Sequence, residues 1–371
     1  MTMGRVNAIA LNLRATPGGT AVGVLRQNCP VEILSQSAGW YQVNARQDGA
    51  TLHGWVAANY VSLDTAGTIP PPTVVPIPDD ATHAVTQVNN AVIAPDGQTF
   101  GYLWHPTGYY VPGTTSLTAW LSIAGTATGI SPSSGNVLQA VINNEGHMEA
   151  VNSYDDAFLS FGLEQWTSGA GNEPGELAGL LQELRTLDPA AFQDCFGRYN
   201  LDVAPGLNGS PPVGFLLLGG VELGTAAAKQ VLRSADWAYR FWRAGHVESV
   251  RRAQANVAAQ RIRIACSIEV RGRPAGAWMT SEQGVALVLD EHVNRPSDVR
   301  GTLTAAVDAM IAGGTSDDPA QWGDAQEAEL IRRYIAQRNT TRMTDSAKRA
   351  EQIARCVQQG MISDRRGSYR P

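Results

Sequence analysis

Hydrophobic and polar residues alternate over short runs in the first 63 residues of the chain. The β-rich runs are 6–13, 31–34, 40–43, 54–56 and 60–61. Turn-forming residues lie between them at 17–19, 37–39 and 48–49. Several short strands at this spacing are typical of a small barrel. The pattern therefore predicts an all-β domain over residues 1–64.

A proline-rich segment follows the predicted barrel at residues 65–81. Its prolines are Pro70, Pro71, Pro72, Pro76 and Pro78. Proline-rich chains favour the extended polyproline II conformation and act as semi-rigid spacers. We therefore expect a linker here, with a second domain at 82–371.

The second domain begins with a turn-rich, β-like stretch at about 85–130. The runs 98–104 and 108–111 are rich in aromatic residues. The pattern fits either a β lead-in to the second domain or a small subdomain of its own.

The hydrophobic period changes after Ser131. Ser131 and Pro132 form a typical helix start, with serine as the N-cap and proline at the first helical position. Apolar residues then recur at helical spacing, which predicts a helix to about Asn144 with Glu145 and Gly146 at its end.

Most of the remaining chain has helical periodicity. The predicted helices are 176–187, 222–243, 246–264, 281–293, 298–312, 322–338 and 344–358. A short β insertion is expected at 148–167. The second domain should therefore be mainly helical with a small β element, an α+β arrangement.

Composition and charge narrow the classes of function. Hydrophobic residues make up 43% of the chain, which supports a folded core. The net charge of −6 disfavours a general nucleic-acid binder and strong attraction to an anionic membrane. The longest apolar run, 213–221, is about nine residues, whereas a membrane span needs about 20. The N-terminus shows no secretory signal pattern.

Cysteine and histidine spacing suggests no metal or disulfide framework. The four cysteines are Cys29, Cys195, Cys266 and Cys356, and no two form a Cys-x-x-Cys pair. The His-Glu-x-x-His pattern of a common metalloprotease is absent from the sequence. We therefore expect no metal site and no cofactor.

Acidic and aromatic residues concentrate at 143–167. Hydrolysis of a glycosidic bond needs one carboxylic acid to protonate the leaving oxygen and a second carboxylate to activate water or stabilise the sugar cation. Glu145 is the best acid candidate, because a helix C-terminus disfavours an ionised carboxylate. Asp155 is the first candidate for the second carboxylate. Tyr154 and Trp166 are candidates to stack on sugar rings.

Each candidate also has an ordinary structural interpretation. A glutamate at a helix end is usually solvated, adjacent aspartates such as 155–156 usually form a turn, and a tryptophan such as Trp166 usually packs in the core. The cluster at 290–296, including Asn294, contacts sugar or simply ends a helix before Pro296. The arginines between 251 and 273 face the anionic wall polymer or form a solvated helix face.

The N-terminal motifs resemble the bacterial SH3 domain family. The resemblance is carried by "LNLR" at 11–14, "GWYQV" at 39–43 and "GWVAANYV" at 54–61, in that order. It covers about 60 residues and implies an SH3-like barrel that binds peptidoglycan or anchors a catalytic domain at the wall. A protein-interaction or purely structural barrel is the alternative.

The stretch at 144–167 resembles the lysozyme-like superfamily. The similar elements are the Asn-Glu-Gly run at 144–146, "NSYD" at 152–155 and "SFGLEQWT" at 160–167. The resemblance implies a helix that ends in the catalytic acid, here Glu145, followed by a small sheet and a cleft lined by Gln165. The neighbouring Trp166 and Thr167 are expected to contact substrate.

Together the motifs predict a modular, endolysin-like peptidoglycan hydrolase that cleaves the β-1,4 glycosidic bond of the glycan strand. Its partner would be cell-wall peptidoglycan, both as substrate and as SH3 ligand, with no nucleic acid and no membrane. A chain made in the cytoplasm without a signal peptide would reach the wall after release or injection. The alternatives are a lytic transglycosylase or chitosanase on the same scaffold, and a non-catalytic wall-binding or phage structural protein.

Overall fold

The computed structural model describes residues 2–8, 10–26, 29–37, 39–47, 50–63, 85–104, 107–124, 130–142 and 146–371. The chain divides into two compact units, Met1–Val75 and Pro76–Pro371, which we call unit 1 and unit 2. The boundary between the units falls within the segment predicted as a linker. The linker residues 65–81 lie outside the described residues.

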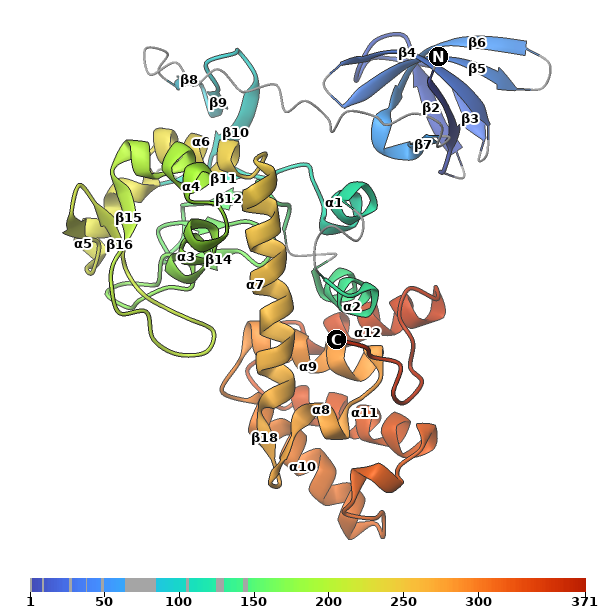
Figure 1. Ribbon diagram of the computed structural model, residues 1–371, viewed down its shortest axis with the longest axis vertical. Coiled ribbons are helices and arrows are strands. Elements are labelled where there is room, and N and C mark those ends of the chain that lie inside the picture. The colour runs from blue at the N-terminus through green and yellow to red at the C-terminus, as the bar shows by residue number, and fades with distance from the viewer. Residues whose placement is uncertain are drawn as a thin grey trace. The chain divides into compact units, whose positions relative to one another are not determined.

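Unit 1 is a curved antiparallel sheet with the strand order β3-β2-β6-β5-β4-β1-β7 (Figure 1). Its strands are β1 (Thr2–Val6), β2 (Ala10–Arg14), β3 (Ala21–Arg26), β4 (Pro30–Ser37), β5 (Trp40–Gln47), β6 (Ala50–Ala57) and β7 (Val61–Leu63). A 3-10 turn, η1 (Ala58–Tyr60), precedes β7. The runs expected at 31–34, 40–43 and 54–56 lie in β4, β5 and β6. The run expected at 6–13 is instead divided between β1 and β2, and β3 was not expected.

The core of unit 1 follows from the two-residue period of its strands. In β5, Val43 and Ala45 are fully buried, whereas Gln42 and Arg46 point to solvent. The same alternation buries residues of the other strands, so the sheet curls around a small aliphatic cluster.

Unit 2 contains a second antiparallel sheet, with the order β14-β13-β12-β11-β10-β9-β8. Its strands are β8 (Thr86–Val88), β9 (Ala91–Ile93), β10 (Thr99–Leu103), β11 (Tyr109–Val111), β12 (Val151–Asn152), β13 (Ser160–Phe161) and β14 (Trp166–Thr167). Because β11 pairs with β12, the β-like lead-in and the β insertion form one sheet. The lead-in is therefore not a separate subdomain.

The helices of unit 2 are α1 (Leu117–Ala124), α2 (Pro132–Ile142), α3 (Leu177–Leu187), α4 (Pro189–Cys195), α5 (Ala226–Lys229), α6 (Ala235–Ala244), α7 (Glu248–Ser267), α8 (Ala275–Trp278), α9 (Glu282–Asn294), α10 (Val299–Ala312), α11 (Asp324–Arg338) and α12 (Ser346–Gln358). Short 3-10 turns occur at η3 (Gly197–Tyr199), η4 (Gln230–Arg233) and η5 (Pro319–Gln321). Two small sheets complete the unit: β15 (Leu201–Val203), β16 (Leu216–Leu218) and β17 (Val221–Glu222), and β18 (Glu269–Val270) with β19 (Arg273–Pro274).

One predicted helix was wrong. The range 222–243 is divided into β17, α5, η4 and α6. Two N-caps explain the division: the hydroxyl of Thr225 accepts from the Ala228 amide, and the hydroxyl of Ser234 accepts from the Trp237 amide. Each cap starts a new helix, because its side chain replaces a backbone acceptor at that point.

The predicted start of α2 is confirmed. Ser131 accepts a hydrogen bond from the Ser134 amide at 3.0 Å, as an N-cap should. The apolar residues Val137, Leu138, Val141 and Ile142 are buried, which fixes the face that α2 presents to the core.

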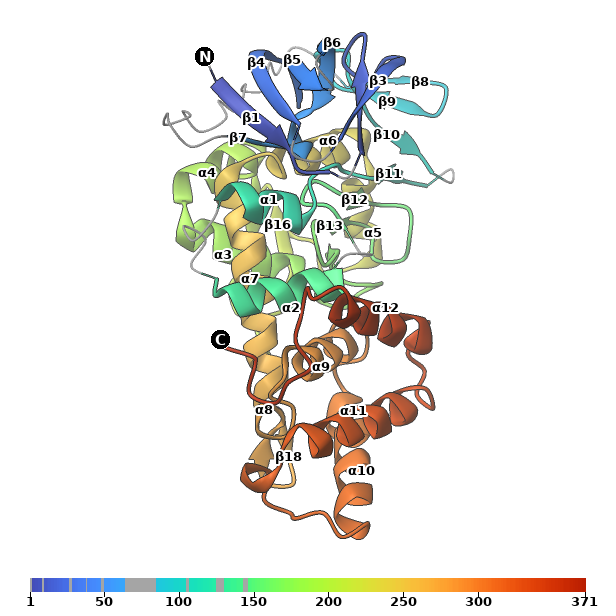
Figure 2. The ribbon, with the colours of Figure 1, turned by 90° about the vertical axis from the view of Figure 1, so that its right-hand side faces the viewer.

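The long helix α7 runs between the sheet of strands β8–β14 and the C-terminal helices (Figure 1, Figure 2). One of its ends lies beside this sheet and α6, and the other lies among α8, α9 and α10. Helix α2 packs against both α7 and α9. Among the described residues, no helix is long and apolar enough to span a membrane.

Candidate functional site

One face of the seven-stranded sheet in unit 2 carries a row of polar and aromatic side chains. Tyr110 pairs with Asn152, Asn152 pairs with Ser160, and Ser160 pairs with Thr167. Direct cross-strand partners project from the same face of a sheet. These four side chains therefore form one line across β11–β14.

The neighbouring row belongs to the core. Val111, Val151, Phe161 and Trp166 are successive cross-strand partners, and each is at most 1% exposed. The ring of Phe161 lies 5.2 Å from that of Phe241 on α6. The strand period thus directs Trp166 inward. In this structure the Trp166 ring is part of the core, and its stacking on substrate stays a prediction.

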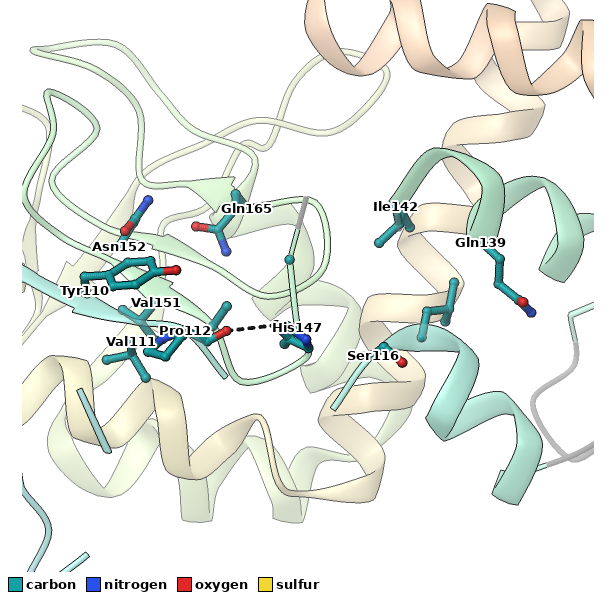
Figure 3. A pocket seen from close by; sticks show the side chains of 13 residues that line it. Tyr110, Val111, Pro112, Ser116, Gln139, Ile142, His147, Val151, Asn152 and Gln165 are labelled. Carbon is teal, nitrogen blue, oxygen red and sulfur yellow. Dashed lines mark hydrogen bonds between the residues drawn. The ribbon is translucent and has the colours of Figure 1, made fainter. Parts of the chain in front are cut away.

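A pocket of about 340 Å³ lies between the polar row and the helices α1 and α2. Figure 3 shows Tyr110, Asn152 and Gln165 on the sheet side, and Ser116, Gln139 and Ile142 on the helix side. Pro112, Gly146 and His147 are also among its lining residues. The pocket therefore collects residues from four separate parts of the sequence.

The predicted acid, Glu145, lies outside the described residues. The described residues on either side of the segment 143–145, Ile142 and Gly146, both line the pocket.

Gly146 occupies a position where a side chain does not fit. A Cβ added there would lie 2.6 Å from the carbonyl oxygen of Gly162 and 2.9 Å from that of Leu163. Real Cβ atoms do not approach oxygen atoms so closely, and the obstructing atoms are backbone. The glycine thus allows the 146–148 turn to lie against the 162–165 loop.

Gln254 of α7 joins these same two segments. Its side-chain oxygen accepts from the Leu163 amide at 3.0 Å, and its side-chain nitrogen donates to the Met148 carbonyl at 2.8 Å. Gln254 is fully buried. A buried side-chain amide whose oxygen and nitrogen both bond to backbone groups holds the two segments in one arrangement.

Gln165 and Asn152 bring amide groups to the pocket. Gln165 has a φ of +52°, in the left-handed region that non-glycine residues rarely adopt, and its nitrogen donates to the Gly162 carbonyl at 2.8 Å. The Oδ1 atom of Asn152 is buried and has no hydrogen-bond partner. Such an unsatisfied acceptor is costly, so a ligand that donates a hydrogen bond would relieve it.

His147 is the histidine of the pocket. Its Nδ1 atom donates to the carbonyl oxygen of Pro112 at 2.9 Å (Figure 3). Among the described lining residues, none is an aspartate or glutamate. The described part of the pocket is thus rich in amide, hydroxyl and aromatic groups.

Glu149 is a buried acid that the sequence reasoning missed. Its carboxylate accepts hydrogen bonds from the hydroxyl groups of Thr114 and Thr115 at 2.9 and 2.7 Å, and from the Thr115 amide. The His246 ring lies 3.9 Å away. The only sequence signal was an acid flanked by the apolar residues Met148 and Ala150.

The surroundings keep Glu149 ionised. Burial raises the pKa of Glu149, but His246, the hydrogen bond from Thr115 and the charge of Arg251 together hold it below its ordinary value. Burial lowers the pKa of His246, and Arg251 lowers it further against the opposing effect of Glu149. An ionised, fully enclosed carboxylate is suited to fixing the turn after His147 rather than to donating a proton.

The structure places Asp155 and Tyr154 in the loop between β12 and β13, and neither lines the pocket. Asp155 is exposed, and its carboxylate accepts from the Ala157 amide at 3.0 Å, a local turn contact. Arg233 donates to the backbone carbonyls of Tyr154 and Asp155. The structure therefore does not bring Asp155 together with the pocket.

Neither Thr167 nor Asn294 lines the pocket. Thr167 lies in the polar row on β14, as the direct cross-strand partner of Ser160 on β13. Asn294 ends α9 and donates to the Asp290 carbonyl at 2.9 Å, so it closes the helix and does not line the pocket. In the same cluster Asp290 pairs with Arg338 and Arg349 inside the protein.

Two arginines that could have formed a solvated helix face are enclosed. Arg261 is 4% exposed and pairs with Glu164 at 3.3 Å and Glu176 at 2.7 Å. Arg251 donates to the Gly245 carbonyl and to the Thr115 hydroxyl. Both arginines join α7 to neighbouring segments. Among the described residues, no group of three His, Cys, Asp or Glu side chains could hold a metal ion.

Unit 1 has a groove of its own, with a volume of about 400 Å³. It is lined by Ala8, Leu11, Asn12, Arg14, Trp40, Ala57 and Tyr60. The Arg14 guanidinium carbon lies 5.9 Å from the centre of the Trp40 ring, and Tyr60 is 45% exposed. Most of these residues come from the three sequence motifs of the N-terminal region.

Residues 9–62 match the bacterial SH3 domain family. Unit 1 contains a bacterial SH3 domain. Bacterial SH3 domains commonly bind cell-wall peptidoglycan. No curated protein and no solved structure matches the chain, so the SH3 domain is the part whose family is shown.

Proposed function

We propose that the chain is a peptidoglycan hydrolase. Its SH3 domain holds the cell wall, and unit 2 cleaves the β-1,4 glycosidic bond of the glycan strand. Glu145 is the general acid in this proposal. The lysozyme-like character of unit 2 is part of the proposal and rests on the sequence motifs at 144–167.

The observation that supports this proposal most directly is the position of the pocket. Ile142 and Gly146 flank the segment of Glu145, and both line a cavity shared with Asn152 and Gln165. Gln165 belongs to the motif that suggested a substrate cleft. Two stretches separated by about 20 residues therefore contribute to one cavity, as a cleft between a helix end and a small sheet requires.

In this proposal Glu145 and the lining residues of the pocket have separate roles. A protonated Glu145 gives its proton to the leaving glycosidic oxygen, which general acid catalysis accelerates by typically 10²–10⁴-fold. The amides of Asn152 and Gln165 hydrogen-bond the hydroxyl or acetamido groups of the sugar. Asn152 in particular gains a partner for its buried oxygen, so ligand binding removes an existing cost.

The SH3 domain contributes attachment rather than chemistry. Its groove combines Trp40, Tyr60 and Arg14, which suits a ligand with both apolar and anionic parts, such as the wall polymer with its peptides. Tethering unit 2 to the wall raises its effective concentration at the glycan. In this proposal the protein acts at the wall after release or injection.

A lytic transglycosylase is the second candidate. Such an enzyme needs a single catalytic carboxylate, because a hydroxyl of the sugar itself replaces water as the nucleophile. Within the described lining no second carboxylate is present, and Asp155 lies in an exposed turn. Both observations favour a mechanism that does not use Asp155.

Digestion of purified peptidoglycan in ¹⁸O-labelled water, followed by mass spectrometry, tests the proposal. A hydrolase leaves one labelled oxygen at the new sugar end, whereas a transglycosylase gives unlabelled products lighter by one water. Glu145→Gln should lower turnover by at least about 10²-fold without changing the melting temperature. Glu222→Gln, an exposed acid on β17, is the matched control.

Three results would contradict parts of the proposal. Cleavage by Glu145→Gln at a near wild-type rate would remove Glu145 as the acid. Cleavage restricted to an unacetylated polymer would identify a chitosanase. Sedimentation with the wall without loss of glycan would identify a non-catalytic binding protein.

A further inference from the structure

Three exposed aromatic side chains gather on the sheet of unit 2 beside the pocket. Tyr102, Trp104 and Tyr110 are 47%, 52% and 40% exposed. Tyr102 is the direct cross-strand partner of Tyr110, and the ring centres of Trp104 and Tyr110 are 6.0 Å apart. Large aromatic groups seldom remain this exposed in a cluster unless the surface binds something. We call these three residues the aromatic patch.

The aromatic patch is continuous with the pocket. Tyr110 lines the pocket and also belongs to the patch. Its partner on the other side is Asn152, so Tyr102, Tyr110 and Asn152 lie in one line across β10, β11 and β12. A ligand that leaves the pocket along the sheet would therefore pass directly onto the aromatic rings.

The strands that carry the patch hold few charged residues. Asp96 is the only Asp, Glu, Lys or Arg residue between positions 85 and 111. Exposed amide and hydroxyl residues lie on the same strands and turns, including Asn90, whose carbonyl accepts from the Leu103 amide, and Thr99 at the start of β10. An aromatic face with neutral hydrogen-bonding groups nearby matches a pyranose ring, which has C–H groups on its faces and hydroxyl groups around its rim.

We propose that the aromatic patch binds sugars of a neutral glycan strand that lie further along the strand from the bond cleaved in the pocket. The inference rests on the proposed function for the class of ligand. It adds sugar-binding positions that the sequence motifs did not indicate, on strands outside the 144–167 stretch. Binding to remote sugars would then help to position the strand in the pocket.

The backbone beneath the patch is well held, so substitutions there test binding rather than folding. The Trp104 amide donates to the Gly108 carbonyl at 2.9 Å, and β10 pairs with both β9 and β11. Side chains that are about half exposed contribute little to the core. Trp104→Ala and Tyr102→Ala should therefore melt close to the parent protein.

The test measures binding of peptide-free β-1,4-linked N-acetylglucosamine oligomers, a trimer and a hexamer, by calorimetry. The protein is the full chain carrying Glu145→Gln. Trp104→Ala should weaken hexamer binding about five- to tenfold and leave trimer binding nearly unchanged. Trp104→Phe should restore most of the loss, because the apolar ring face is retained. Val221→Ala, which removes a 65% exposed residue of β17, is the control.

Several results would overturn the aromatic patch as a glycan site. The first is that Trp104→Ala binds the hexamer as tightly as the control does. The second is that Trp104→Ala loses equal affinity for the trimer and the hexamer, and the third is that the parent protein does not bind the hexamer. A change in molar mass by light scattering with unchanged glycan binding would instead make the patch a contact between copies of the chain. Length-dependent binding without any cleavage of peptidoglycan by the wild type would support the patch and refute only the catalytic proposal.

Discussion

Replacing Glu149 by glutamine tests whether the buried acid fixes the turn behind the pocket. The change keeps the size of the side chain but removes its charge and replaces one acceptor oxygen with a donor group. That donor would face the amide or hydroxyl of Thr115, both of which now donate to the carboxylate. Arg251 would also lose a nearby negative charge, and His246 would lose the charge that opposes the lowering of its pKa by burial.

The contacts give the size of the effect. Hydrogen bonds to a charged group contribute about 1.5–3 kcal/mol each, and breaking a buried charge pair costs about 3–5 kcal/mol. Glutamine keeps one acceptor, so we expect a loss of about 2–4 kcal/mol in the free energy of unfolding. For a unit of this size the loss corresponds to a fall of about 5–10 °C in melting temperature.

The same substitution has a predictable pH dependence. The pKa of Glu149 is lowered in the folded protein, so the carboxylate stabilises the fold above its ordinary value of 4.5. This stabilisation disappears as the pH falls through the lowered pKa. The difference in melting temperature between wild type and Glu149→Gln should therefore be constant near neutral pH and should shrink below about pH 4.5.

Thermal melting between pH 3 and 8 and glycan cleavage well below the melting temperature are the two assays. Glu149→Gln should lose stability but keep most of its activity, the opposite of Glu145→Gln. A Glu149→Gln protein that melts within about 1 °C of wild type at pH 7 would refute the structural role. Loss of all cleavage by a stable Glu149→Gln protein would make Glu149 the catalytic acid instead.

Two further substitutions test the geometry around the pocket. Gly146→Ala should destabilise unit 2 by about 1–3 kcal/mol in denaturant unfolding, because its Cβ would collide with the Gly162 carbonyl. Gly301→Ala in α10 is the control, because a Cβ there meets nothing within 4 Å. It should be neutral or stabilising by up to about 1 kcal/mol. Equal changes in stability for the two glycine variants would contradict the argument. Asp155→Asn should leave the rate of peptidoglycan cleavage within about threefold of wild type, because the Asp155 carboxylate accepts from the Ala157 amide in a local turn. A loss of rate as large as that expected for an essential catalytic group would show that Asp155 takes part in the mechanism.

Elements with strong local signals were predictable from the sequence. Strands β4, β5 and β6 of unit 1 follow from short alternating runs separated by turns, and α2 follows from Ser131, Pro132 and a helical apolar period. The predicted helices 281–293, 298–312 and 344–358 agree with α9, α10 and α12 to within two residues. In each case neighbouring residues alone decide the backbone conformation, through capping and periodicity.

The helix predicted at 222–243 shows how a local signal was overlooked. Thr225 and Ser234 are good N-caps, and both were present in the sequence. Between them Lys229 is buried and donates to the carbonyls of Gly169 and Glu173. The interruption of the helix allows Lys229 to pack against a loop that is distant in the sequence. The hydrophobic period of the 222–243 segment contains no information about such a contact.

The sequence by itself determined the bacterial SH3 domain, most of the helices of unit 2 and the residue types available for glycan chemistry. Only the tertiary structure decided which of two neighbours, Trp166 or Thr167, faces the core and which joins the polar row. Strand alternation requires them to face opposite sides, but the pairing of Trp166 with Phe161 and of Thr167 with Ser160 fixes which side is the core. Likewise, the burial of Glu149 and the continuity of the pocket with the aromatic patch depend on contacts between segments far apart in the chain, and no local pattern encodes them.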